Sequence, residues 1–217
     1  MRKLLLILAV ILVALLLIKH KNMTWRQSLL KITYPLIMLK SKLFPHEKSI
    51  RINDRNVKPV SSFYELKATA NNGTPVDLHQ FKGKKILLVN TASNCGYTGQ
   101  YSELEELHKK YTNLVVLGFP ANDFKEQEKG NDAEIAEFCK VNFGVTFQLM
   151  QKSQVIKGAG QNEIFNWLTH QEKNGWCNQQ PVWNFSKYLV NEEGTLTHFF
   201  ATTISPLSED VQKEIKN

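Results

Sequence analysis

The chain has 217 residues, 42% of them hydrophobic, which is enough for one domain with a buried core and an additional segment. Its net charge of +7 is concentrated at the N-terminus: residues 1–58 hold 12 of the 27 Lys and Arg but only 2 of the 20 Asp and Glu, so the remainder is mildly acidic and does not indicate nucleic-acid binding. The three cysteines are too few for a disulfide scaffold and lack zinc-site spacing, and the six histidines are scattered, so we expect no metal and no cofactor.

Residues 1–21 are predicted to form a transmembrane anchor. Leu4 to Ile18 is an uninterrupted run of fifteen apolar residues with Lys and Arg on both sides. As a helix this run would be about 22 Å long, shorter than the ~30 Å hydrocarbon core, although the flanking cations can make up part of the difference by snorkelling. A cleaved signal peptide is the alternative, but no small-x-small cleavage site follows the run. We therefore expect an uncleaved single-pass anchor that binds the membrane through residues 4–18.

Residues 22–58 are predicted to be a basic amphipathic juxtamembrane segment. Pro35 is expected to interrupt its helix, and two alternatives remain open: the helix lies on an anionic membrane surface, or it packs on the following domain. The excess of Lys and Arg behind the anchor favours a domain on the cytoplasmic side, although Arg2 and Lys3 argue for the opposite orientation. The apolar stripe of this helix consists of residues three or four positions apart: Trp25, Leu29, Ile32, Leu36, Leu39 and Leu43.

Residues 59–217 are predicted to form one α/β domain. Two continuous apolar runs, 86–89 and 114–119, indicate strands buried on both faces, and the helix between them indicates a right-handed parallel unit. An antiparallel hairpin and a closing helix follow, which is the order of a thioredoxin-like fold, a central mixed sheet flanked by helices. The predicted elements are strands at 63–68, 74–76, 86–89, 114–119, 146–150, 185–190 and 196–200, and helices at 98–111, 132–141, 161–170 and 208–215.

Cys95 is predicted to lie in the turn between the first buried strand and the helix that follows it. The free backbone N–H groups and the positive dipole end of the helix favour a thiolate at this position. In a thioredoxin-type dithiol site a second cysteine stands three residues later, but here that residue is Thr98, so simple dithiol–disulfide exchange is disfavoured. A single activated thiolate is suited to attack on an electrophilic oxygen, which produces a sulfenic acid.

Three sequence motifs around this turn resemble the signatures of the glutathione peroxidase family, in its cysteine rather than selenocysteine form. The resemblance covers about residues 60–215 and keeps the motifs in family order, whereas the N-terminal segment lies outside it. It implies a thioredoxin-like fold, a peroxidase activity and a compact, monomeric member. The motifs are residues 90–96 (Asn-Thr-Ala-Ser-Asn-Cys-Gly), residues 118–124 (Gly-Phe-Pro-Ala-Asn-Asp-Phe) followed by Gln127-Glu128, and Trp183-Asn184-Phe185 followed by Lys187-Tyr188-Leu189-Val190.

The resemblance implies a role for four residues. Cys95 is implied to be the peroxidatic nucleophile, and Gln127, Trp183 and Asn184 are implied to hydrogen-bond its sulfur and the peroxide. The chemistry of these side chains agrees, because amide and indole N–H groups are donors that favour a thiolate and can stabilise a departing hydroxide or alkoxide. Taken singly, Trp183 would be a core residue and the two amides would be turn or cap residues.

Cys139 resembles the resolving cysteine of thioredoxin-dependent members of the family. The implied cycle oxidises Cys95 to a sulfenic acid, condenses it with Cys139 to a disulfide, and reduces that disulfide with thioredoxin or glutathione. Local unwinding of a helix would be needed for the two sulfurs to meet, and the alternative is that Cys139 is an ordinary buried cysteine. Cys177 matches no cysteine of the family and is predicted to be a surface thiol, with a spare resolving thiol as the alternative.

The sequence therefore predicts a membrane-tethered thiol peroxidase that reduces hydrogen peroxide and organic or lipid hydroperoxides in antioxidant defence. The alternative is a peroxide sensor or redox relay, in which oxidised Cys95 passes a disulfide to a partner protein. A non-enzymatic membrane adaptor is disfavoured because all four implied site residues are present.

Overall fold

The computed structural model describes residues 23–43 and 49–216. The predicted transmembrane anchor, residues 1–21, lies outside this part of the chain. Within the described ranges, none of the helices is both long enough and apolar enough to cross a bilayer.

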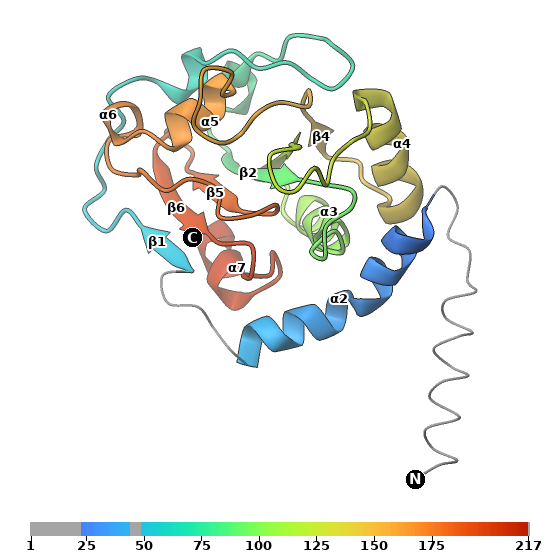
Figure 1. The fold of residues 1–217 in the computed structure, drawn as a ribbon. Coiled ribbons are helices and arrows are strands. Elements are labelled where there is room, and N and C mark those ends of the chain that lie inside the picture. Colours follow the sequence, from blue (N-terminus) through green and yellow to red (C-terminus); the bar gives the residue numbers. More distant parts are fainter. Residues whose placement is uncertain (1–22, 44–48, 217) are drawn as a thin grey trace, which may run out of the picture.

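A six-stranded mixed sheet forms the centre of the domain (Figure 1). Its central strand, β2, pairs in parallel with β3 and antiparallel with β5, so the predicted parallel unit and the predicted C-terminal hairpin meet at this strand. All seven residues of β2 are buried, as its continuous apolar run predicted. Across the sheet the strands are β1 (Ile50–Ile52), β6 (Leu196–Phe200), β5 (Lys187–Val190), β2 (Lys85–Thr91), β3 (Leu114–Pro120) and β4 (Gln148–Leu149).

Helices cover both faces of the sheet and close two apolar cores. Leu87 and Val89 of β2 point into one core with α3, α4 and α7, and Ile86 and Leu88 point into the other with α5. These three layers are the predicted thioredoxin-like α/β fold. The helices are α2 (Trp25–Leu43), η1 (Phe63–Glu65), η2 (Leu78–Phe81), α3 (Gln100–Lys110), α4 (Asp132–Phe143), α5 (Glu163–Leu168), α6 (Gln171–Asn174) and α7 (Glu209–Lys216).

The predicted strand at residues 63–68 is wrong. Phe63–Glu65 form the short 3-10 helix η1, and the Ser62 hydroxyl caps it by accepting a hydrogen bond from the backbone N–H of Tyr64 at 3.2 Å. The aromatic residues that suggested a strand are buried by packing and not by strand pairing. The ring of Phe63 lies edge-on to Trp167 of α5, with centroids 5.4 Å apart.

Smaller differences concern the ends of elements. An isolated β-bridge between Thr69 and Pro75 stands in place of the predicted strand at 74–76. Helix α4 continues two residues beyond its predicted end and stops at Gly144, whose φ of 64° is the left-handed conformation that ends many helices. Helix α5 begins at Glu163, later than predicted, because the Asn162 side chain caps it.

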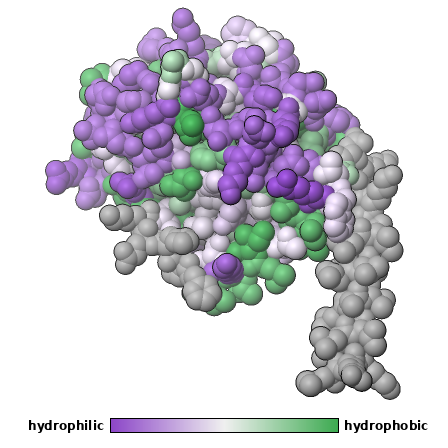
Figure 2. Space-filling model, viewed as in Figure 1, coloured by the Kyte–Doolittle hydropathy of each residue, from purple (hydrophilic) through white to green (hydrophobic). Residues whose placement is uncertain are grey.

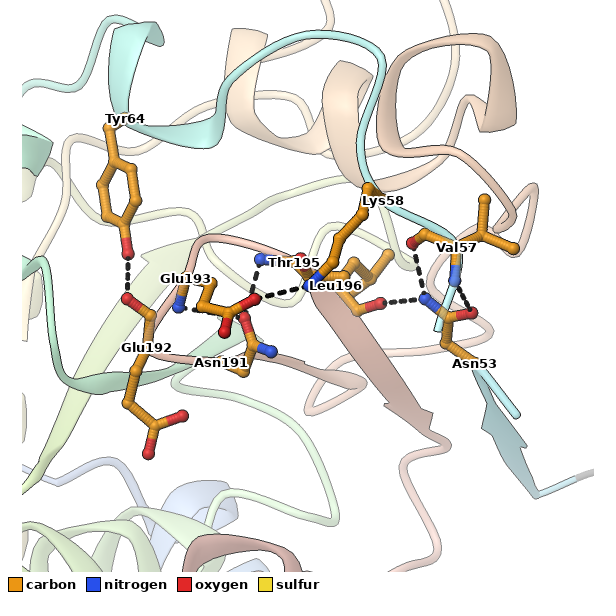
Figure 3. Close-up of polar contacts among 9 residues, drawn as sticks. All are labelled: Asn53, Val57, Lys58, Tyr64, Asn191, Glu192, Glu193, Thr195 and Leu196. Atoms are coloured by element: carbon orange, nitrogen blue, oxygen red, sulfur yellow. Dashed lines mark hydrogen bonds and ion pairs between the residues drawn. The ribbon is translucent and has the colours of Figure 1, made fainter. Parts of the chain in front are cut away.

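The turn between β5 and β6 is fixed by side chains on both sides (Figure 3). Asn191 Oδ1 accepts hydrogen bonds from the backbone N–H groups of Glu193 and Thr195, at 3.1 and 2.9 Å, which closes the turn. The Tyr64 hydroxyl of η1 donates to the backbone oxygen of Glu192 at 2.9 Å, so the N-terminal part of the domain is tied to this hairpin.

Helix α2 runs without interruption through Pro35, so the predicted break there is wrong. Pro35 removes one helical hydrogen bond, but the helix is held along its length by the domain (Figure 1). Lys31 Nζ donates to the backbone oxygen of Asn142 in α4 at 2.8 Å, and the Tyr34 hydroxyl donates to the carboxylate of Glu103 in α3. The helix therefore packs on the domain, which was one of the two alternatives.

Candidate active site

Cys95 lies in the turn between the end of β2 and the start of α3, as the sequence predicted. The hydroxyl of Thr98 holds this turn: it accepts a hydrogen bond from the backbone N–H of Cys95 at 3.1 Å and lies 3.0 Å from the carbonyl oxygen of Ala92. The backbone N–H of Thr98 also donates to the carbonyl oxygen of Cys95, at 3.1 Å. Thr98, which stands where a dithiol site has its second cysteine, therefore fixes the backbone of Cys95.

Four hydrogen-bonding groups surround the sulfur of Cys95. The backbone N–H of Tyr97 donates a hydrogen bond to Sγ at 3.5 Å, and the side chains of Trp183 and Asn184 and the backbone of Gly96 lie near enough to favour the thiolate. The cysteine is fully buried, and this burial raises the pKa of the thiol above its ordinary value, although the four neighbouring groups lower it. The backbone donors of the turn lower the pKa, which is the direction expected from the sequence, but desolvation raises it by more.

Gln127 is connected to the site through Asn184. Asn184 Nδ2 donates to Gln127 Oε1 at 3.0 Å, and the Asn184 side chain is fully buried. The backbone oxygen of Gln127 accepts a hydrogen bond from the N–H of Asn94 at 3.0 Å, which ties the loop carrying Gln127 to the turn of Cys95. The structure thus brings Trp183 and Asn184 to the sulfur, and Gln127 to Asn184.

Asn90, at the end of the apolar part of β2, holds the segment that carries Trp183 and Asn184. Its Nδ2 donates to the backbone oxygen of Trp183 at 3.1 Å, and its Oδ1 accepts from the N–H of Ser186 at 3.0 Å. Its backbone oxygen accepts from the N–H of Phe185, a residue with a φ of 66°. No role was predicted for Asn90 from the sequence, although a buried amide inside an apolar strand is a signal for one.

Lys187 is a second residue to which the sequence analysis gave no role. Its side chain is fully buried, and its Nζ donates to the backbone oxygen of Phe185 and to Gln100 Oε1, both at 2.7 Å. Burial lowers the pKa of this amine to about 7. Lys187 therefore holds the Trp183–Ser186 segment through the backbone oxygen of Phe185, in addition to the contacts of Asn90.

Cys139 lies on α4, fully buried and in the same apolar core as Cys95. Both thiols are free. The Cys139 thiol lies beside the hydroxyl of Tyr101, and burial raises its pKa to about 12.

The prediction that Cys177 is a surface thiol is wrong. The side chain of Cys177 is buried, and burial raises the pKa of its thiol. The polar residues around it suggested an exposed loop, but Asn174 turns its side chain inward to hold that loop. Asn174 Oδ1 accepts from the N–H of Cys177 at 2.7 Å, and Asn174 Nδ2 donates to the carbonyl oxygen of Cys177 at 2.8 Å.

Glu128, directly after Gln127, is buried beneath the turn of Cys95. Its carboxylate accepts a hydrogen bond from the Ser93 hydroxyl at 3.0 Å, and burial raises its pKa to about 7. This contact is a second link between the two loops of the site. Across residues 23–43 and 49–216, no group of three His, Cys, Asp or Glu side chains is arranged to hold a metal ion.

Comparison with known proteins gives consistent matches. A sequence model described as "Glutathione peroxidase" matches residues 63–169. Glutathione peroxidase-like peroxiredoxin 2 of Saccharomyces cerevisiae is 43% identical over 152 residues, which are 69% of this chain and 93% of that protein. The glutathione peroxidase homolog BsaA of Staphylococcus epidermidis is 40% identical over 159 residues, 72% of this chain and 98% of that protein. The crystal structure of Trgpx in apo form superposes with a TM-score of 0.55 and 35% identity, covering 72% of this chain and 95% of that one.

Proposed function

This chain belongs to the glutathione peroxidase family and is a thiol peroxidase, and we propose that Cys95 is the cysteine that reacts with the peroxide. One observation carries the proposal: donors from two distant segments surround the buried sulfur of Cys95. One segment is the turn of Cys95 itself, and the other contains Trp183 and Asn184. Neither Cys139 nor Cys177 has such a set of donors among the residues that the structure describes.

In the first step, Cys95 gives up its proton and the thiolate attacks the terminal oxygen of a hydroperoxide. A sulfur–oxygen bond forms and the oxygen–oxygen bond breaks, so the sulfur is oxidised by two electrons to a sulfenic acid. The departing hydroxide or alkoxide takes up the proton and leaves as water or an alcohol. The N–H groups of Trp183 and Asn184 stabilise the negative charge, first on the sulfur and then on the departing oxygen.

Asn184 has a second function in this mechanism. Among the described residues its Oδ1 is buried without a hydrogen-bond partner, so it is available to accept a hydrogen bond from the O–H of the peroxide. Gln127 accepts a hydrogen bond from the amide of Asn184 and so fixes which end of that amide faces the sulfur. We therefore treat Gln127 as a positioning residue and Trp183 and Asn184 as catalytic residues.

In the second step, the thiol of Cys139 attacks the sulfenic acid of Cys95. A disulfide forms and water leaves. One molecule of a dithiol reductant, or two molecules of a monothiol, then returns both cysteines to thiols with two electrons and is itself oxidised to a disulfide. The proposed reductant is thioredoxin, on the resemblance of the segment around Cys139, and glutathione is the other candidate. The location of both cysteines in one apolar core supports the pairing.

We also place the enzyme at a membrane, on the evidence of its sequence. The run from Leu4 to Ile18 would anchor it, with the domain on the cytoplasmic side. Hydrogen peroxide and organic or lipid hydroperoxides are the proposed substrates, because an anchored site lies near oxidised lipid.

A peroxide sensor or redox relay is the second candidate. The burial of Cys139 beneath Tyr101 favours it, because slow opening of α4 would leave the sulfenic acid of Cys95 free to react with a thiol of a partner protein.

Peroxide consumption by the full chain in detergent tests the proposal, with thioredoxin and glutathione supplied in separate reactions. Cys95→Ser should abolish turnover, and Cys139→Ser should stop thioredoxin-dependent turnover while still consuming one equivalent of peroxide. Cys177→Ser is the matched control, a buried cysteine with no proposed role, and should turn over like the wild type. Undiminished turnover by Cys95→Ser would contradict the proposal, and rapid turnover of Cys139→Ser with glutathione would remove the resolving role of Cys139.

A further inference from the structure

Helix α2 has an apolar face that the domain leaves largely exposed, although Leu39 also lines a cleft with Leu207 and Glu209 of the domain. The side chains of Trp25, Leu36, Leu39 and Leu43 are 64%, 68%, 52% and 65% exposed. They lie three, four or eleven positions apart, which places them on one side of the helix. Figure 2 shows apolar residues gathered along α2 at the lower edge of the molecule. We call these four side chains the outer stripe.

The opposite face of α2 sits directly on the turn that carries Cys95. A Cβ at Gly99 would lie 2.3 Å from the ring of Tyr34, and a Cβ at Gly96 would lie 3.2 Å from Ile37 Cδ1. The hydroxyls of Ser41 and Tyr97 are 3.4 Å apart. The helix therefore has two apolar faces, and only the inner one is used to pack on the domain.

The charges of α2 indicate what covers the outer stripe. The helix contains no Asp or Glu, and the cations Arg26 and Lys40 are exposed on one border of the stripe. A second copy of this chain would bring the same positive charges face to face, whereas an anionic lipid surface complements both the charge and the apolar side chains. Trp25 follows Ile18 by seven residues, which can span at most about 25 Å, so an anchor at Leu4–Ile18 would hold α2 near the membrane.

We infer that the outer stripe docks on the surface of an anionic lipid bilayer, with α2 lying in the plane of the surface. Because α2 is about 10 Å across, docking would hold the turn of Cys95 about one helix diameter from the lipid. If the proposed peroxidase function holds, the substrates favoured by this arrangement are hydroperoxides of membrane lipids.

Tryptophan quenching by brominated lipid tests the docking. Trp25 belongs to the outer stripe itself, so it is replaced by Phe in both the test and the control variant. The full chain with Leu39→Trp is reconstituted in phosphatidylcholine vesicles with and without phosphatidylserine. Position 39 lies about 21 Å along the helix from Trp25, so the anchor alone does not hold it at the surface. Val60→Trp is the matched control, because Val60 is an apolar residue, 76% exposed, outside α2. We expect brominated lipid to quench Leu39→Trp severalfold more than the control, and most strongly with phosphatidylserine.

The charges give a second readout. Neutralising Arg26 and Lys40 together, as Arg26→Gln and Lys40→Gln, should shift the docking equilibrium about thirtyfold toward the undocked state. Turnover of phospholipid hydroperoxide in vesicles should fall, while turnover of hydrogen peroxide should stay unchanged. Quenching of Leu39→Trp no greater than that of Val60→Trp would overturn the inference. A blue shift of the tryptophan emission without quenching would also overturn it and would favour a protein partner. Loss of all peroxide turnover would contradict the proposed function but leave the quenching result intact.

Discussion

Replacing Asn184 with alanine should slow the reaction of Cys95 with hydrogen peroxide about 10- to 150-fold. The amide of Asn184 lies beside the sulfur and favours its thiolate form, and we propose that it hydrogen-bonds the thiolate. A hydrogen bond to a charged group contributes about 1.5–3 kcal/mol, which gives that range when the bond stabilises the thiolate and the transition state. The same change leaves Gln127 Oε1 without its donor, so we also expect a loss of about 1–3 kcal/mol in the free energy of unfolding.

The assay is a single-turnover measurement of the full chain mixed with hydrogen peroxide, followed by the loss of free Cys95 thiol. Asn166→Ala is the matched control, because Asn166 also donates its amide to a glutamine, Gln161 Oε1 at 3.2 Å, but lies on α5 beyond the other face of the sheet. The control should react at the wild-type rate. If Asn184→Ala keeps its fold by circular dichroism and reacts within about twofold of the wild type, the catalytic role of this amide is refuted.

Three further predictions concern groups around the site. Thr98→Val removes the hydroxyl that accepts from the N–H of Cys95, so the free energy of unfolding should fall by about 1–3 kcal/mol; an unchanged melting temperature would contradict this. Lys187 has a folded pKa of about 7 against an ordinary 10.5, so the unfolded chain binds more protons between these values and stability rises with pH there. In urea unfolding, the free energy of unfolding of the wild type relative to Lys187→Met should be larger near pH 10 than near pH 7. The same difference at both pH values would argue against a buried neutral amine. The pH dependence that Glu128 contributes has the opposite sign. Its folded pKa of about 7 lies above the ordinary 4.5, so its contribution to the free energy of unfolding falls as pH rises from 4.5 to 7. Glu128→Gln should therefore gain stability relative to the wild type between about pH 5 and about pH 8, and equal pH profiles would be the contrary result.

The centre of the fold could be predicted from the sequence because its signals are local. The runs at 86–89 and 114–119 are apolar without a break, and a strand buried on both faces needs no other pattern. Residues 63–68 show the limit of such reasoning. Phe63 is as apolar as a strand residue, but the Ser62 cap and the ring of Trp167, about a hundred residues away, place it in a 3-10 helix.

The site was only partly predictable, for a related reason. The three motifs named Cys95, Trp183 and Asn184, and the structure brings these side chains together. Burial, by contrast, is a property of the whole fold, so the raised pKa of Cys95 and the buried position of Cys177 could not be read from neighbouring residues. Asn90 was visible in the first motif, but its hydrogen bonds to a segment more than ninety residues later were not.

The apolar stripe of α2 was predicted from its spacing, but its direction was not. Periodicity identifies a face of a helix without saying what that face contacts. The inner contacts of Tyr34 and Lys31 decide the orientation, and they leave four of the six residues of the predicted stripe exposed, while Leu29 and Ile32 are half-buried.

Trapping the oxidised cysteine tests the central claim most directly. The full chain with Cys139→Ser is treated with one equivalent of hydrogen peroxide in the presence of dimedone, which reacts with sulfenic acids, and the modified peptide is identified by mass spectrometry. We predict a single adduct on Cys95. An adduct on Cys177, with Cys95 recovered as the free thiol, would contradict the assignment of Cys95 as the cysteine that attacks the peroxide.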